Sequence, residues 1–227
     1  MDNVLAALEH NDRVCEVSLQ SLQTSQVEKV LSAMQNPLPE LTLLSLDWIG
    51  QGSPIFPDSF LAPHLQKLYL HRGIPFPALR KLLLSSTDIV TLQLGEVSPS
   101  AYISPEEFAT CLPLLTRLKR LVFVSVSIRP DLGNRHPRPP TRIVVSNLTE
   151  LDFQGMSKYL EDLVARIDAP LLNLISIRLF DQLVFDDVQL VHLIRRTPAF
   201  NISNEVCVCL FEPMWHMYAV VVVKTHV

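Results

Sequence analysis

A short apolar pattern recurs along the chain and constrains its fold more than any other feature. The pattern is apolar-x-x-apolar-x-apolar, and it occurs seven times in the 227 residues. Its middle positions follow one another at intervals of 24 to 30 residues. Such regular spacing predicts a stack of similar units rather than a single irregular core. The seven occurrences are Val14/Val17/Leu19, Leu41/Leu44/Leu46, Leu65/Leu68/Leu70, Ile89/Leu92/Leu94, Leu118/Leu121/Phe123, Leu148/Leu151/Phe153 and Leu172/Ile175/Ile177.

The spacing within the pattern predicts one short strand in each unit. The last two apolar residues lie two positions apart, so their side chains share one face of a strand. Stacked units then form a parallel sheet with a continuous apolar ladder on its inner face. This arrangement, with units of 24–30 residues, is typical of an α/β leucine-rich-repeat solenoid: a horseshoe with a concave parallel sheet and convex helices. No asparagine ladder follows the strands, so we expect irregular repeats.

Amphipathic segments lie between the predicted strands and carry helix-start signals. Ser104-Pro105-Glu106-Glu107 combines an N-cap serine, proline at the first helical position and glutamate at the third. Ser25-Gln26-Val27-Glu28 matches a capping box. Further helices are predicted over Phe76 to Leu84, Lys158 to Ile167, and 188–196, the last opened by Asp186-Asp187.

The repeat rhythm divides the chain in two. We assign residues 1–200 to the solenoid, with about seven repeats and a basic Pro/Arg-rich loop at 127–146. The loop is interpreted as an insertion, with phosphate or an acidic partner as the alternative. Residues 201–227 form an atypical apolar tail, interpreted as an aberrant or truncated end, a terminal cap or a membrane anchor. Within the tail, Ala219 to Val223 favours a strand.

Composition and motifs argue against several classes of function. The net charge of −4 gives no overall basic character, so we expect no nucleic-acid partner. Four scattered cysteines predict free thiols in a reducing, intracellular compartment, cytoplasmic or nuclear. The N-terminus lacks a secretory signal pattern, and no membrane association is expected. Neither a metal-ligand spacing, a nucleophile elbow nor a phosphate loop occurs, which predicts a non-enzymatic protein without a cofactor.

The side chains beside and between the buried strand pairs should line the concave face, where solenoids usually bind partners. We therefore predict a protein partner there, with tyrosine and arginine as favoured anchors. The candidate binding residues are Lys67, Tyr69, His71, Gln93, Arg120, Glu150, Asp152 and Arg178.

Five segments resemble the leucine-rich-repeat region of fungal, mushroom-type F-box-like proteins. They are ALEHNDRV, FPALRKLLLSSTDIVTLQL, YISPEEFATCLPLLTRLKRL, KYLEDLVARIDAPLL and LIRRTPAF. The resemblance implies a protein-interaction module, with substrate recognition for a ubiquitin ligase as its setting. A ligase adaptor would be a partner only through an F-box outside this chain. The alternatives are the sensor repeats of a nucleotide-binding signalling protein and a non-functional fragment.

Overall fold

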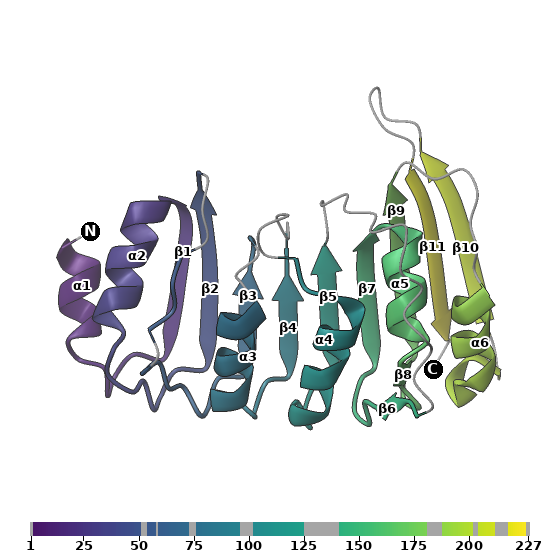
Figure 1. The fold of residues 1–227 in the computed structure, drawn as a ribbon, viewed down its shortest axis with the longest axis horizontal. Helices are drawn as coiled ribbons and strands as arrows, with labels where there is room; N and C mark the ends of the chain where they lie inside the picture. Colours follow the sequence, from purple (N-terminus) through teal and green to yellow (C-terminus); the bar gives the residue numbers. More distant parts are fainter. Residues whose placement is uncertain are drawn as a thin grey trace.

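The computed structural model has an α/β fold built on one large sheet. It describes residues 2–50, 54–57, 59–72, 76–95, 102–124, 141–180, 188–201, 204–211 and 218–225, the last two ranges mostly by backbone alone. The strands stand side by side along the long axis of the molecule (Figure 1). The large sheet has nine strands in the order β1-β2-β3-β4-β5-β7-β9-β11-β10.

Successive strands of the large sheet are parallel neighbours from β1 to β9. A second, two-stranded sheet pairs β6 (Ile143–Val144) with β8 (Ile167–Asp168). The parallel strands are β1 (Glu16–Gln23), β2 (Leu43–Ile49), β3 (Lys67–Leu70), β4 (Thr91–Leu94), β5 (Arg120–Val124), β7 (Glu150–Gly155) and β9 (Leu174–Phe180).

The strand register confirms the apolar ladder that the sequence predicted and shows that it consists of two aligned rows. One ladder aligns the middle positions of the pattern: Val17, Leu44, Leu68, Leu92, Leu121, Leu151 and Ile175. The second aligns Leu19, Leu46, Leu70, Leu94, Phe123, Phe153 and Ile177. Both ladders are buried from β2 onward, and a period of two places them on the same face.

From the second occurrence of the pattern onward, its first apolar position forms a third buried row just before each strand. Leu41, Leu65 and Leu118 are all 0% exposed, and each N–H donates to the carbonyl three residues earlier. Backbone bonds also join neighbouring units here: the N–H groups of Gln66 and Lys67 both donate to the Thr42 carbonyl. These bonds satisfy the backbone of the turns at the amino ends of the strands.

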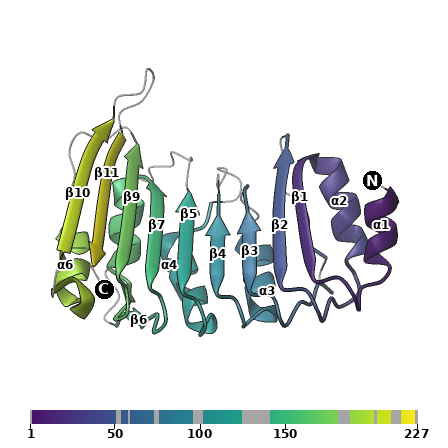
Figure 2. The same ribbon diagram turned by 180° about the vertical axis from the view of Figure 1, so that it is seen from behind.

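The helices all lie on one side of the large sheet (Figure 1), and Figure 2 shows the opposite side, on which the described residues place no helix. Each helix between two strands presents its apolar side to the buried ladders. The described α-helices are α1 (Asp2–Leu8), α2 (Thr24–Ala33), α3 (Phe76–Ser85), α4 (Pro105–Cys111), α5 (Ser157–Val164) and α6 (Val188–Arg196). Single-turn 3₁₀ segments follow at η2 (Leu112–Leu114) and η3 (Pro198–Asn201).

The structure confirms one helix start and corrects two other boundaries. Ser104 Oγ accepts the N–H of Glu107 at 3.1 Å, as the capping pattern predicted. Helix α2 begins before Ser25 instead, and its N-cap is Gln23, whose N–H donates to Gln26 at 2.9 Å. Helix α5 ends at Val164 rather than Ile167, because Ile167 pairs with Ile143 in the second sheet. Asp186 and Asp187 lie outside the described residues.

Aromatic side chains fill the space between the sheet and helices α4 and α5. Phe123 and Phe153, neighbours in the second ladder, stack with ring centroids 5.9 Å apart. Tyr159 of α5 stacks on Phe123 at 4.9 Å, and Phe108 of α4 packs on the same ring at 5.4 Å. Rings replace leucines in the ladder where β5 and β7 meet these two helices.

The tail extends the large sheet as an antiparallel hairpin. Strand β11 (Tyr218–Thr225) pairs antiparallel with β9, and β10 (Asn204–Phe211) pairs with β11 at the edge of the sheet. The strand predicted for Ala219 to Val223 is thus present, and its partner is the last parallel strand. The described strands of the tail therefore belong to the same sheet as the seven parallel strands, and a capping role stays a prediction.

Candidate functional site

The helix-free face of the large sheet carries the eight residues predicted to bind a partner. Register places side chains of neighbouring strands in rows across this face. One row runs Lys67, Thr91, Arg120, Glu150 and Leu174, from β3 to β9. The next row runs Tyr69, Gln93, Val122, Asp152 and Ser176.

The structure brings six of the eight predicted residues together in these two rows. Lys67 and Arg120 are exposed, whereas the other four, Tyr69, Gln93, Glu150 and Asp152, are half-buried. His71 and Arg178 lie further towards the carboxyl ends of the strands, and they are not neighbours of each other. His71 follows β3 and donates its backbone N–H to the Leu46 carbonyl at 3.0 Å. Arg178 is exposed on β9, beside Gln154.

Charges on the helix-free face fall into bands that follow the strands. Asp47 lies on β2, and Lys67 and Arg120 lie on β3 and β5. Glu150 and Asp152 follow on β7. Over β3, β4 and β5 this face carries no acidic side chain among the described residues. Arg120 Nε lies 3.4 Å from a carboxylate oxygen of Glu150, and both side chains are about half exposed, at 54% and 41%.

Three positions of this face are less accessible than their outward register suggests. Val122 is 8% exposed and lies between Gln93 and Asp152 in its row. Ser45 is 6% exposed and lies beside the larger Tyr69. Gly95 follows β4, and a Cβ atom there would lie 2.9 Å from the carbonyl oxygen of His71. These positions therefore offer little accessible side-chain surface. The alternation of residues along the strands does not predict this.

The opposite side of the sheet holds a different set of polar contacts, which join α5 to α6. Glu161 of α5 accepts the backbone N–H groups of Gln189 and Leu190, at 2.8 and 3.2 Å. These donors are among those that the first turn of α6 leaves without helical partners. Arg196 donates to the carbonyls of Val164 and Ile167 and pairs with Asp168. Both sets of contacts join neighbouring elements on the helix side of the sheet.

Among the described residues of the helix side, three groups have a shifted pKa. Burial raises the pKa of the Tyr159 phenol well above its usual value, assisted by Tyr102 and Glu107. Burial also raises the pKa of the Cys111 thiol. Burial lowers the pKa of the Arg196 guanidinium, and the Asp168 carboxylate opposes this effect. These shifts come mainly from burial in the helix layer and do not assemble acid–base chemistry.

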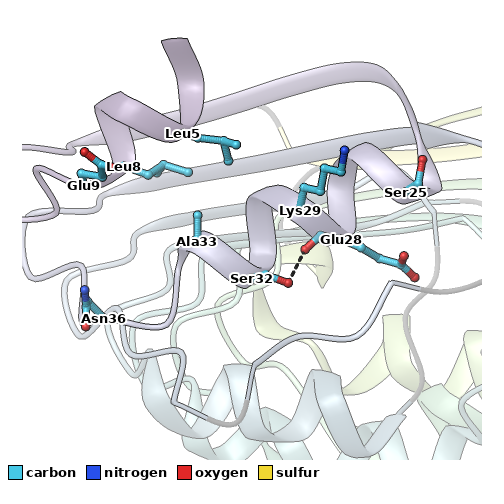
Figure 3. Close-up of a pocket in the computed structure, with 9 residues that line it drawn as sticks. All are labelled: Leu5, Leu8, Glu9, Ser25, Glu28, Lys29, Ser32, Ala33 and Asn36. Atoms are coloured by element: carbon cyan, nitrogen blue, oxygen red, sulfur yellow. Dashed lines mark hydrogen bonds between the residues drawn. The ribbon is translucent and has the colours of Figure 1, made fainter. Parts of the chain in front are cut away.

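Among the described residues, hollows open on the helix side beside α1 and beside α3. One, of about 670 Å³, lies between α1 and α2 and is shown in Figure 3, where Leu5 and Leu8 come from one helix and Lys29 and Ala33 from the other. The second, of about 720 Å³, lies between α3 and residues 54–57 and 59–61, and it is lined mainly by proline, phenylalanine, leucine and isoleucine side chains. Neither contains a nucleophile paired with a base.

The remaining features of the described residues do not point to a cofactor or a membrane. Within the described ranges, no three His, Cys, Asp or Glu side chains are grouped so that they could hold a metal ion. Among the helices that the structure describes, none has the length and apolar character needed to cross a bilayer. Most of the basic loop, including Arg129, Arg135 and Arg138, lies outside the described residues.

No family model, curated protein or solved structure matches the chain.

Proposed function

We propose that this chain is a leucine-rich-repeat solenoid whose helix-free sheet face binds another protein. The observation that carries the proposal is the contrast between the two sides of the strands. One side is closed by helices over a continuous apolar core. The other presents aligned rows of Tyr, Gln, Arg, Lys and carboxylate side chains, on which the described residues place no helix.

The composition of these rows supports a protein as the partner. Tyr69 offers a ring with a polar tip, and Arg120 offers several donors, which are the features that dominate protein interfaces. Acidic residues on β2 and β7 flank the basic residues on β3 and β5, so a partner must match both signs. A surface of this kind favours specific recognition of a folded or extended protein segment over binding of a uniform polyanion.

A photo-crosslinking experiment in the native host tests the proposal. The full-length gene product carries p-benzoylphenylalanine at Tyr69 or, as the matched control, at Leu84, which is 49% exposed on α3. We expect a crosslinked protein from position 69 that is absent from position 84. Crosslinks to the same protein from both positions, or from 84 alone, would contradict the assignment of the binding face.

The crosslinked protein then gives a quantitative test with purified components. The double variant Tyr69→Ala with Arg120→Ala should weaken its binding by about 2 kcal/mol or more, as interface anchors do. Lys29→Ala with Arg195→Ala changes exposed residues on the helix side and should leave affinity unchanged. Equal affinity of both double variants would remove the helix-free face from the interaction.

On the resemblance to fungal F-box-like proteins, the proposed biological setting is substrate recognition for a ubiquitin ligase. Affinity purification of the full-length gene product tests this setting separately. Recovery of the ligase adaptor together with the partner of the helix-free face would support it. A complex that contains that partner but no ligase component would argue against it.

A further inference from the structure

The middle of the helix-free face has a local excess of hydrogen-bond donors. Lys67, Thr91 and Arg120 occupy one row on three adjacent strands, with Thr91 in the centre. Neighbouring strands are about 4.8 Å apart, so the two cationic residues arise about 10 Å from each other. Both have long, flexible side chains that can lean over the shorter threonine. The next row adds Tyr69 and Gln93, which lie beside Lys67 and Thr91.

We propose that this row is an acceptor site for a single acidic side chain of the protein partner, bound over Thr91 between Lys67 and Arg120. This inference rests on the proposed function and specifies the chemistry that the partner must supply. Lys67 has no ion pair among the described residues, and its side chain is exposed. A carboxylate over Thr91 can accept from the ammonium group, the guanidinium and the hydroxyl together.

The ion pair with Glu150 leaves Arg120 able to take part. The contact involves Nε at 3.4 Å, and the guanidinium has four further N–H donors on its two terminal nitrogens. The pair is exposed, so its net contribution is small and an incoming carboxylate can compete with it. Glu150 is therefore an internal competitor for the group that the partner carboxylate must reach.

The flanking charges favour an isolated acid over a polyanion. In this row, Glu16 on β1 lies two strands before Lys67, and Glu150 on β7 lies next to Arg120, with Asp152 in the neighbouring row. A nucleic-acid backbone crossing the strands would bring further negative charges against these carboxylates. A protein segment with one acidic residue and basic residues on either side of it matches this order of charges from β1 to β7. The site therefore selects a charge pattern and not merely negative charge.

Peptide display tests the acceptor site even while the partner is unidentified. A random library of twelve-residue peptides is selected on the full chain and, in parallel, on Lys67→Glu, Arg120→Glu and the control Lys29→Glu. We expect peptides from the wild type to share one Asp or Glu beside basic residues. Each reversal on the helix-free face should weaken their binding by about tenfold or more, and Lys29→Glu should not.

Two further variants separate this site from general electrostatics. Glu150→Gln removes the competing carboxylate and should tighten binding of an acidic peptide by up to about fivefold. Replacing the acid of a selected peptide with its amide should abolish this gain. Circular dichroism of every variant should match the wild type, since each substitution is at an exposed or half-exposed position.

Each other outcome overturns a defined part of the proposal. Peptides that need Tyr69 but carry no acid, or acidic peptides that ignore both charge reversals, overturn the acceptor site and leave the proposed function intact. If no selected peptide binds to the helix-free face, both the acceptor site and the proposed function are overturned. Binding of a single-stranded 20-nucleotide DNA that is lost in Lys67→Glu would also overturn the inference, because the site would then accept a polyanion.

Discussion

The two sides of the large sheet differ in how they are stabilised and in how far their side chains are free to form new contacts. On the helix side, leucines and aromatic rings align from strand to strand under a layer of helices, and even its polar contacts serve to join helices. On the helix-free side, the ion pair Arg120–Glu150 is exposed and Lys67 has no acidic neighbour over β3 to β5 among the described residues. Stability is therefore concentrated on the helix side, and the helix-free side contributes little to it.

The largest change in stability is expected from a comparison of two adjacent residues of β5 that point to opposite sides of the sheet. Leu121 is 0% exposed in the first ladder, so Leu121→Ala should lower the free energy of unfolding by about 2–5 kcal/mol. Arg120→Ala should change it by less than about 0.5 kcal/mol. Urea denaturation of both variants measures the difference. Similar losses in the two variants would show that the helix-free face also carries stability.

A smaller effect is expected for the ion pair on the helix side. Arg196→Gln removes donors from the carbonyls of Val164 and Ile167 and leaves Asp168 without this cation. We expect a loss of about 2 kcal/mol in the free energy of unfolding, as for bonds to a charged donor. The matched control is Arg120→Gln on the other side. A loss below that of the control would mean that α6 does not depend on this contact.

Removing one buried hydroxyl should stabilise the protein. Tyr159 is 8% exposed, and its hydroxyl has no hydrogen-bond partner among the described residues. Tyr159→Phe should therefore raise the free energy of unfolding by about 1 kcal/mol at neutral pH, with the stacked rings retained. Tyr69→Phe on the helix-free side is the control and should change little. Urea denaturation near pH 7 compares the two variants.

The same residue predicts a pH dependence. Because the folded pKa of Tyr159 is raised, folding favours the neutral phenol. Its contribution is complete below the unfolded pKa of about 10 and is lost as the pH rises above that value. Between pH 9 and 11, Tyr159→Phe should therefore lose less stability than the wild type. Parallel curves for the two proteins would show that Tyr159 does not resist ionisation.

The smallest effect is expected for the ion pair of the helix-free face. A double-mutant cycle of Arg120→Ala and Glu150→Ala should give a coupling energy below about 1 kcal/mol, falling further in high salt. Thermal or urea unfolding at two ionic strengths measures it. A coupling of several kcal/mol would contradict the idea that this pair is weak enough for a partner's carboxylate to displace.

The sequence by itself determined the features that depend on local periodicity. The spacing of Val17, Leu44, Leu68 and the later middle positions gave both the strand positions and their register, because equivalent residues of successive units must share one buried face. The cap at Ser104 and the helix over residues 76–85 were also predictable, since propensity and capping act within a few residues. Six of the eight candidate site residues accordingly fall into two adjacent rows.

Contacts between distant residues decided the rest. The pairing of β11 with β9 joins residues more than 35 positions apart, and no local pattern in the tail specifies that partner. The capping of α6 by Glu161, the contacts of Arg196 and the burial of Val122 likewise depend on which side chains the neighbouring unit supplies. Local spacing of apolar residues determines where each strand begins and which strand it pairs with. The packing of neighbouring strands and helices determines how polar groups find hydrogen-bond partners. It also determines how much of the helix-free face stays accessible.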